Sequence, residues 1–321
     1  MLRGEVFSLE DGGKLAITGR PIVASQKTRM TPAPPCKVCN GPTIFLGEKH
    51  GKITEKVFEI YRCSGCGFAF VGNPWTDFAQ VYSQKYYEGR GTDPLVDYVF
   101  ELDFPDRTIR KYEWQGLLDV VRTLLGRDQG FRWLDYGCGN GGLVRFGRQN
   151  TGIEIFGFEE GWIADKARRS GIPLLDRNTL GLAAGSFDVI TAIEVMEHTL
   201  DPIDTLRHIR KLLKPGGLFL CTTGNARKHR SRLLQWTYIV PEIHLSFFEP
   251  ATLEVALNRT GFRAEYRGFV AGHTKIIQGR VLKNLRVRTR SPWQRFLPWP
   301  VMARIIDYRV GFTDHPIGWA E

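Results

Sequence analysis

Apolar and polar residues alternate in two patterns through the middle of the chain, and these patterns predict a regular order of strands and helices. Short apolar runs predict strands at residues 131–137, 153–160, 186–195 and 218–225. Apolar residues at three- and four-residue steps predict the helices between them, at residues 143–150, 161–171 and 198–217. Strands that alternate with helices indicate parallel βαβ units, so the predicted fold class is α/β, a sheet with helices on both faces.

Composition shifts on either side of this core predict five segments. They are an N-terminal extension (1–30), a zinc ribbon (31–72), an aromatic connector interrupted by proline and glycine (73–106), the α/β domain (107–272) and a basic C-terminal tail (273–321). The α/β domain is expected to begin with an amphipathic helix, because apolar residues recur at helical spacing over residues 107–125.

Four of the six cysteines form two C-x-x-C pairs, Cys36 with Cys39 and Cys63 with Cys66. Each pair can place two thiolates at one tight turn, and two such turns complete the tetrahedral sulfur shell of a Zn²⁺ ion. Disulfides or free thiols are the alternatives, but a cytosolic compartment keeps thiols reduced. Because four sulfurs leave no position for a reactive water, the predicted zinc is structural. The remaining two, Cys138 and Cys221, need only to be small buried residues.

The overall composition is that of a globular protein, with 42% hydrophobic and 24% charged residues among 321. The first thirty residues hold no continuous apolar segment, and no later run approaches the ~20 apolar residues of a membrane span, so a cytoplasmic location is expected. The net charge of +10 is concentrated in residues 226–232 and in the C-terminal segment. Such charge usually serves solubility, although it also suits nucleic acid or an anionic surface.

A glycine turn follows the first predicted strand. In WLDYGCGNGG, residues 133–142, the glycines at 137, 139 and 142 spell G-x-G-x-x-G, which lets the backbone approach either a dinucleotide or an adenosyl amino acid. Two acidic residues favour the second ligand. Asp135 would crowd a pyrophosphate, and Glu159, at the end of the second strand, is placed to accept both ribose hydroxyls.

Four motifs in order resemble those of class I S-adenosylmethionine (SAM)-dependent methyltransferases over roughly residues 131–269: LDYGCGNGG, GFEEGWIADKAR, SFDVITAIEVMEH and LLKPGG. The resemblance implies a Rossmann-like sheet and SAM as cofactor. The residues that it places at the cofactor are Asp135, Gly137, Cys138, Gly139, Glu159, Asp176 and Glu194. Asp135, Gly137 and Gly139 would lie near the methionine part, Glu159 at the ribose, Asp176 at the adenine and Glu194 behind the cofactor. The alternatives are helix packing for Gly142, an ordinary turn for Asp176 and a small buried residue for Cys138.

Two histidines are the catalytic candidates. Glu197 and His198 follow Glu194 at i+3 and i+4, so one helical turn can bring the three together, and His244 precedes a helix that starts after Pro250. One histidine could act as a general base, since its unperturbed pKa of ~6.5 lets it accept a proton near neutrality. Alternatively, Glu194, Glu197, His198 and His244 could hold a divalent metal, as a similar E-x-x-E-H does in small-RNA 3′-end and some quinone methyltransferases. The metal-free base is preferred, and a third reading gives His198 only a local capping role.

The resemblance implies methyl transfer by in-line displacement. The zinc ribbon and the segments 81–89 and 232–262 resemble bacterial members that act on sugars, lipid-linked glycans or secondary metabolites, so the expected acceptor is a small molecule, a sugar or a lipid-linked glycan. The alternatives are an RNA methyltransferase that holds nucleic acid with its ribbon and basic clusters, and a SAM-binding module without catalysis. Trp293, Phe296 and Trp299 lie among arginines, a composition suited to peripheral contact with an anionic membrane; otherwise these aromatics pack on the core.

Overall fold

The structure is a computed structural model that describes residues 32–90, 97–311 and 313–321. The N-terminal extension expected at residues 1–30 lies outside the described residues. Within the described part of the chain, no helix is long and apolar enough to cross a bilayer.

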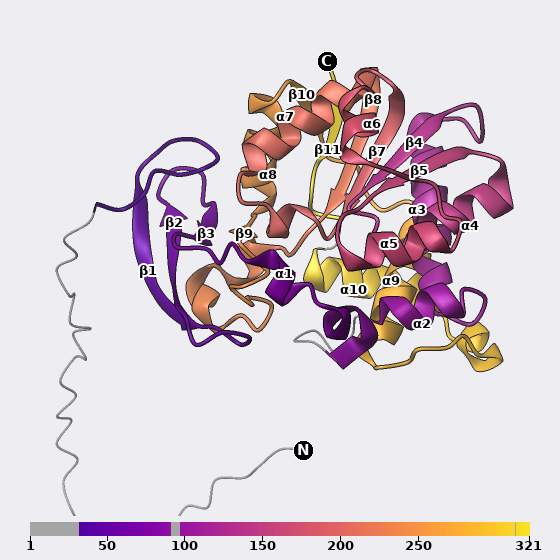
Figure 1. Ribbon diagram of the computed structural model, residues 1–321, viewed down its shortest axis with the longest axis horizontal. Coiled ribbons are helices and arrows are strands. Elements are labelled where there is room, and N and C mark those ends of the chain that lie inside the picture. Colours follow the sequence, from indigo (N-terminus) through magenta and orange to yellow (C-terminus); the bar gives the residue numbers. More distant parts are fainter. Residues whose placement is uncertain (1–31, 91–96, 312) are drawn as a thin grey trace, which may run out of the picture. The chain divides into compact units, whose positions relative to one another are not determined.

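A seven-stranded sheet forms the centre of the α/β domain (Figure 1). Its strands are β4 (Arg132–Tyr136), β5 (Glu154–Phe158), β6 (Leu174–Leu175), β7 (Phe187–Ile193), β8 (Leu213–Thr222), β10 (Phe262–Glu265) and β11 (Ile317–Ala320). The order across the sheet is β10-β11-β8-β7-β4-β5-β6. Strands β4 to β8 pair in parallel, and β11 runs antiparallel to both β8 and β10. The predicted α/β class is confirmed, and the four strands expected from the apolar runs are β4, β5, β7 and β8.

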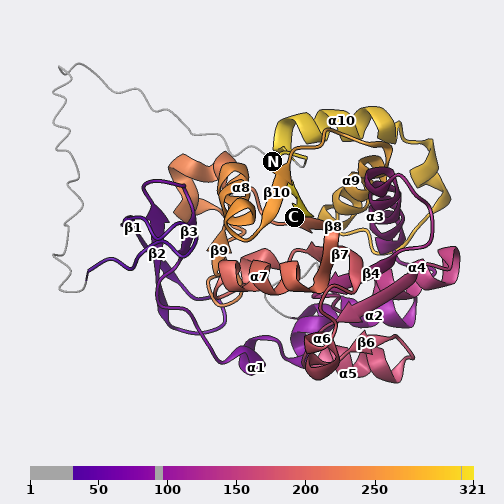
Figure 2. The same ribbon diagram turned by 90° about the horizontal axis from the view of Figure 1, so that it is seen from above.

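Helices cover both faces of this sheet. They are α3 (Arg110–Leu125), α4 (Gly142–Thr151), α5 (Trp162–Arg169), α6 (Arg177–Gly181), α7 (Pro202–Leu212), α8 (Pro250–Arg259) and α9 (Ala271–Asn284). The helix α10 (Trp299–Val310) packs on α9. Successive strand residues point to opposite faces, so Trp133 packs among residues of α3 and α4 while Leu134 packs among residues of α7 and α8. Figure 2 shows α7 on one side of the sheet and α3 and α9 on the other.

The predicted ribbon is a second, four-stranded antiparallel sheet, of order β1-β2-β3-β9. Its strands are β1 (Thr43–His50), β2 (Val57–Cys63), β3 (Ala69–Val71) and β9 (Ser246–Phe247). The first three come from the cysteine-containing segment, whereas β9 comes from the chain between β8 and α8. The ribbon sheet is therefore completed by residues that lie in sequence between β8 and β10, two strands of the main sheet.

Short helices connect these units. They are α1 (Phe78–Val81), a π-helix (Tyr86–Arg90), α2 (Tyr98–Asp103) and three 3₁₀ segments, Met196–His198, Ala226–Gln235 and Pro292–Phe296. The aromatic connector thus contributes single helical turns, since its prolines and glycines interrupt longer helices.

The segment after residue 273, expected as a basic tail because of its charge, is folded. It continues α9, forms α10 and ends in β11, the strand between β8 and β10. Ile276 and Ile317 enter the core, whereas most of the arginines lie at the surface. The high charge of this segment suggested a tail, although its apolar residues recur at the spacing of a helix and a strand.

Helices α3 and α9 approach each other through two glycines. A Cβ added to Gly116 would lie 2.6 Å from the carbonyl oxygen of Gly272, and a Cβ added to Gly272 would lie 2.6 Å from that of Gly116. The two backbones are therefore in contact, which places α9 beside the carboxyl ends of β7 and β8.

Replacing Gly116 with alanine is expected to lower the free energy of unfolding by about 1–3 kcal/mol, because the new methyl group must push the two helices apart. Urea unfolding followed by circular dichroism measures this change. Gly181→Ala is the control, since an added Cβ in α6 meets nothing within 4 Å. An unchanged unfolding midpoint in Gly116→Ala would contradict the close helix contact.

Candidate functional site

The glycine turn joins β4 to α4 at the carboxyl edge of the main sheet. Gly137, Gly139 and Gly141 all have positive φ, between 55° and 73°, a conformation that favours glycine. A Cβ on Gly137 would lie 2.5 Å from Val195, and one on Gly139 would lie 2.9 Å from the ring of Tyr98. The turn therefore presents bare backbone, and its first glycine touches the segment that contains Glu194, Glu197 and His198.

Two carboxylates stand beside this turn. The Glu159 carboxylate accepts a hydrogen bond from the Gly139 amide at 2.8 Å. Asp135 is 6% exposed, and its carboxylate accepts a hydrogen bond from Thr191 Oγ1 at 2.8 Å. Burial raises the pKa of Asp135 to about 7, although the Thr191 hydroxyl partly opposes this, and burial also raises the pKa of Glu159. Asp135 and Glu159, both expected at the cofactor, thus lie at the turn. Each carboxyl group can accept hydrogen bonds from a ligand that carries N–H or O–H donors.

Cys138 and Asp176, also expected at the cofactor, lie in two different local settings. Cys138 lies within the turn, and its sulfur packs against Gly157 of β5. The amide of Cys138 donates to the Phe158 carbonyl oxygen at 3.1 Å, which ties the turn to β5. Asp176 caps the N-terminus of α6, where its carboxylate accepts from the Thr179 amide at 2.7 Å. Gly142 begins α4, and a Cβ there would lie 2.1 Å from Trp114 of α3, so helix packing alone requires a glycine.

An aromatic layer from the connector covers the turn. Tyr87 stacks between Tyr98 and Trp162, with ring centroids 5.8 and 6.1 Å away. The Tyr98 carbonyl oxygen accepts a hydrogen bond from the side chain of Asn140, a residue of the turn itself. The sequence marked this segment only as aromatic and irregular, and nothing in its local pattern singled out Tyr98. Its placement depends on tertiary contacts.

Glu194 ends β7 in an unusual conformation. Its φ of 56° is left-handed for a non-glycine residue, and the Thr222 hydroxyl donates to its carboxylate at 2.8 Å. Arg280 of α9 donates to the same carboxylate at 3.0 Å. Burial alone would raise the pKa of Glu194, but the Arg280 charge and the two hydrogen bonds lower it to about 2. Glu194 is therefore an ionised partner of Arg280, a residue that sequence reasoning missed.

Glu197, His198 and His244 form a compact cluster. One donor atom from each lies within 4.8 Å of the others, and Glu194 is not part of this group. The structure therefore brings together three of the four residues expected for a metal. Burial raises the pKa of Glu197 to about 8, and the negative charge of Glu194 adds to this rise. Without a bound cation, Glu197 holds its proton near neutral pH.

The hydrogen bonds of the two histidines define their tautomers. His198 Nδ1 lies 2.7 Å from the Ile243 carbonyl oxygen, and His244 Nδ1 is bonded to the Tyr238 carbonyl oxygen. Because a carbonyl oxygen only accepts, these contacts favour the tautomer with the proton on Nδ1 and an unprotonated Nε2. The Tyr82 hydroxyl also lies 3.0 Å from His198 Nδ1, where it can accept from the same proton. Burial lowers the pKa of His244 to about 3, and His198 adds to the effect, so His244 stays neutral.

A row of stacked rings leads to the cluster. The ring of His244 stacks on Tyr238 at 4.2 Å between centroids, Tyr238 on Trp236 at 4.6 Å, and Trp236 on His229 at 4.4 Å. The Tyr238 hydroxyl also donates to Glu197 at 2.6 Å. A Cβ at Gly224 would lie 2.5 Å from Tyr238, so this glycine lets the row lie close to the end of β8.

The ribbon sheet fixes the backbone next to His244. On one side, the Val71 amide donates to the Leu245 carbonyl oxygen at 3.0 Å, and β9 pairs with β3. On the other side, the Leu245 amide donates to the Glu197 carbonyl oxygen at 2.6 Å, and Ser246 Oγ donates to that of Thr199 at 3.0 Å. Hydrogen bonds therefore connect the ribbon strand β3 to the segment that directly follows His244, and connect that segment to the turn that contains Glu197.

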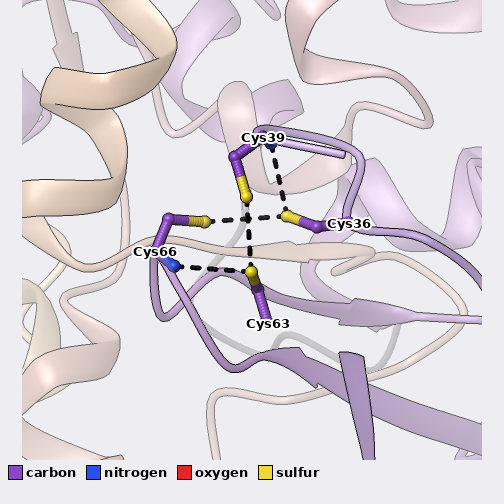
Figure 3. A group of neighbouring side chains, drawn as sticks. All are labelled: Cys36, Cys39, Cys63 and Cys66. Atoms are coloured by element: carbon purple, nitrogen blue, oxygen red, sulfur yellow. Dashed lines mark hydrogen bonds between the residues drawn. The ribbon is translucent and has the colours of Figure 1, made fainter. Parts of the chain in front are cut away.

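The four ribbon cysteines converge at one point (Figure 3). Sulfur atoms of Cys36 and Cys66 lie 3.6 Å apart and those of Cys39 and Cys63 lie 3.4 Å apart, and all four are free thiols. Ligands of a tetrahedral zinc with ~2.3 Å bonds are separated by about 3.8 Å, whereas a disulfide needs ~2.05 Å. Backbone amides of Cys39 and Cys66 point at the sulfurs of Cys36 and Cys63. The donor set and its spacing fit a structural zinc ion.

Comparison with known proteins finds relatives of the α/β domain. Residues 107–266 match a family described as a methyltransferase domain. The ubiquinone biosynthesis O-methyltransferase of Cereibacter sphaeroides is 41% identical over 112 residues, which cover 30% of this chain and 42% of the relative. That of Caulobacter vibrioides is 32% identical over 160 residues, covering 47% of this chain and 62% of the relative. The chain thus matches less than two thirds of the length of these curated relatives.

Solved structures of similar proteins include SAM-dependent methyltransferases. One from Archaeoglobus fulgidus has 18% identity and a TM-score of 0.41, over 69% of this chain and 98% of that one. Another, from Mesorhizobium loti, has 20% identity and a TM-score of 0.40, over 53% of this chain and 96% of that one.

Protein purified without chelator is expected to contain one zinc ion per chain by elemental analysis, because the four thiols already have the required spacing. Cys39→Ser should lose most of the metal, whereas Cys221→Ser, a buried thiol outside the cluster, should retain it. Chelation should unfold the ribbon while the main sheet and its helices persist. Zinc-free protein with an ordered ribbon would contradict this assignment.

Asp135→Asn is expected to change how stability depends on pH. Between the ordinary aspartate pKa of ~3.9 and the folded value of about 7, the unfolded chain ionises while the folded protein keeps the proton, so Asp135 lowers stability as pH rises. The variant lacks this loss, so its stability relative to wild type should increase from about pH 4 to about pH 8.

Urea unfolding across this range measures the effect, and Asp188→Asn is the matched control. Backbone and cationic partners lower the pKa of Asp188 despite partial burial, so its variant should lose relative stability only as pH rises to about 5, and its profile should stay parallel to that of wild type from about pH 5 to pH 8. Parallel pH profiles for Asp135→Asn and wild type would show that Asp135 is not held protonated.

Proposed function

We propose that this chain, whose residues 107–266 match a methyltransferase domain family, is a class I SAM-dependent methyltransferase that transfers a methyl group from SAM to a hydroxyl group of a small-molecule acceptor. The observation that carries the proposal is the contact between the glycine turn and the segment of Glu197 and His198. Gly137 approaches Val195 so closely that a Cβ would lie 2.5 Å from its side chain. Cofactor turn and proton acceptor therefore share one edge of the sheet.

The turn suits SAM in its chemistry. Bare backbone at Gly137 and Gly139 leaves room for a close ligand, and Glu159 offers a carboxylate to the ribose hydroxyls once it leaves the Gly139 amide. When bound, SAM supplies an activated methyl group on a sulfonium. What this chain must add is alignment of the acceptor and removal of its proton.

His198 is the proposed general base. Its Nδ1 proton is held by the Ile243 carbonyl oxygen, so Nε2 can take the proton of the acceptor hydroxyl as the new O–CH₃ bond forms and the S–CH₃ bond breaks. His244 is a weaker base because burial lowers its pKa to about 3, and its neutral ring lies 5.0 Å from that of His198. Glu197, with its raised pKa, would stabilise the imidazolium by ionising.

A divalent metal on Glu197, His198 and His244 is the second candidate, and the 4.8 Å grouping of their donor atoms favours it. Two neutral imidazoles whose Nδ1 protons bind backbone carbonyls are typical of metal ligands. Such a metal would lower the pKa of the acceptor hydroxyl.

The acceptor class follows from the relatives and from the charge. The curated relatives named above are O-methyltransferases of ubiquinone biosynthesis, which supports a small-molecule hydroxyl as acceptor. Within the basic cluster at residues 226–232, Arg230 binds Glu249 and Lys228 lies 3.8 Å from Asp314. Because these cations have internal partners, they give little support to an RNA substrate.

His198→Ala is expected to reduce the turnover number by about 10²–10⁴-fold, because the proton acceptor is lost. SAM affinity, measured by calorimetry, should persist, because His198 does not belong to the glycine turn. The exposed histidine of the ribbon provides the control, and His50→Ala should leave turnover unchanged. Labelled SAM and a panel of phenolic, sugar and lipid-linked acceptors give the assay.

Mild chelation separates the two roles of the cluster. If His198 acts as a general base without a metal, methyl transfer should survive chelation that is mild enough to leave the ribbon zinc in place. Activity that is lost and then restored by magnesium or manganese, but not by zinc, would make Glu197, His198 and His244 ligands. Failure of Gly139→Val to weaken SAM binding would defeat the assignment of the turn.

A further inference from the structure

Helix α10 has apolar residues on two opposite faces. Trp299 and Ala303 are 6% and 0% exposed, and Trp299 packs in one cluster with Leu282 of α9. Figure 2 shows α10 beside α9. On the other side, Val301, Ile305 and Tyr308 are 59%, 53% and 89% exposed. They are spaced by four and three residues, so they line one stripe of the helix. A helix packed on one face only would normally be polar on the other.

The exposed stripe extends beyond the helix. Phe296 and Trp293, in the 3₁₀ segment before α10, are 86% and 49% exposed. We name these two together with Val301, Ile305 and Tyr308 the α10 ridge. Isolated exposed apolar residues are ordinary, but several on neighbouring turns of one short segment mark an interaction surface.

Cations flank the α10 ridge. Arg304 lies ~40° around the helix from Tyr308, and Arg309 lies ~40° from Ile305 on the other side. Arg295 precedes the helix, and neither Arg295 nor Arg309 forms an ion pair in the described part of the chain. The one acidic residue of 291–310, Asp307, accepts hydrogen bonds from Thr313.

We propose that the α10 ridge docks the protein on the surface of an anionic phospholipid bilayer. Aromatic and aliphatic side chains would enter the boundary between headgroups and acyl chains, while Arg295, Arg304 and Arg309 meet the phosphates. A twofold contact with a second copy would place arginines against arginines without acidic partners. Nucleic acid would leave Val301 and Ile305 without suitable partners, since RNA is bound through phosphate contacts and base stacking.

Vesicle flotation with the full-length, zinc-loaded protein tests the proposal. Binding is expected to vesicles of phosphatidylcholine mixed with phosphatidylglycerol, and little to phosphatidylcholine alone. The double variant Ile305→Ser/Tyr308→Ser should bind about tenfold more weakly, because apolar area is lost. Arg295→Gln/Arg309→Gln should lose about fivefold per arginine and the preference for anionic lipid. Leu182→Ser, which removes an 88% exposed leucine in the chain after α6, is the matched control and should bind normally.

Two further measurements keep the proposal open to refutation. Thermal unfolding and SAM binding should be unchanged in all three variants, because the altered side chains are exposed and do not belong to the glycine turn. No binding to anionic vesicles, or equal binding by the Ile305→Ser/Tyr308→Ser variant, overturns the proposal. So does a dimer, or an RNA complex, that dissociates in this variant while vesicles are not bound.

Discussion

The two-sided hydrogen bonding of residues 245–247 is the constraint on which the site depends. The ribbon strand β3 holds this segment from one side, and the turn that contains Glu197 holds it from the other. A two-residue strand has little stability of its own, so its position is set by these neighbours. His244 directly precedes it, so the ribbon orders one member of the proposed catalytic cluster, although the four ribbon cysteines form a separate group.

Buried charge divides the two glutamates of the E-x-x-E-H segment. Arg280 pairs with Glu194 and lowers its pKa to about 2, whereas burial and the charge of Glu194 raise the pKa of Glu197 to about 8, although the Tyr238 hydroxyl donates to it. Arg280 comes from α9, and α9 reaches this position because Gly116 and Gly272 let two helices touch. A packing feature on one face of the sheet thus decides which carboxylate is ionised at its edge.

Sequence patterns anticipated the elements that carry strong local signals. The four apolar strands, the glycine turn and the cysteine pairs could be recognised because their periodicity and spacing depend only on residues that are close together in the sequence. The strand β9 and the cationic partner Arg280 could not, since each is defined by a distant neighbour. The separation of Glu194 from His198 was also beyond prediction, because helical spacing suggested one cluster while the left-handed conformation of Glu194 turns its side chain away.

The last strand of the main sheet has a consequence for the order of assembly. Strand β11 lies between β8 and β10, so β10 has no partner in the sheet until residues 317–320 have arrived. In a chain made from its N-terminus, the edge of β8 is therefore open while nearly a hundred later residues emerge. Unpaired strand edges attract other chains, so synthesis passes through an aggregation-prone stage that ends when β11 inserts.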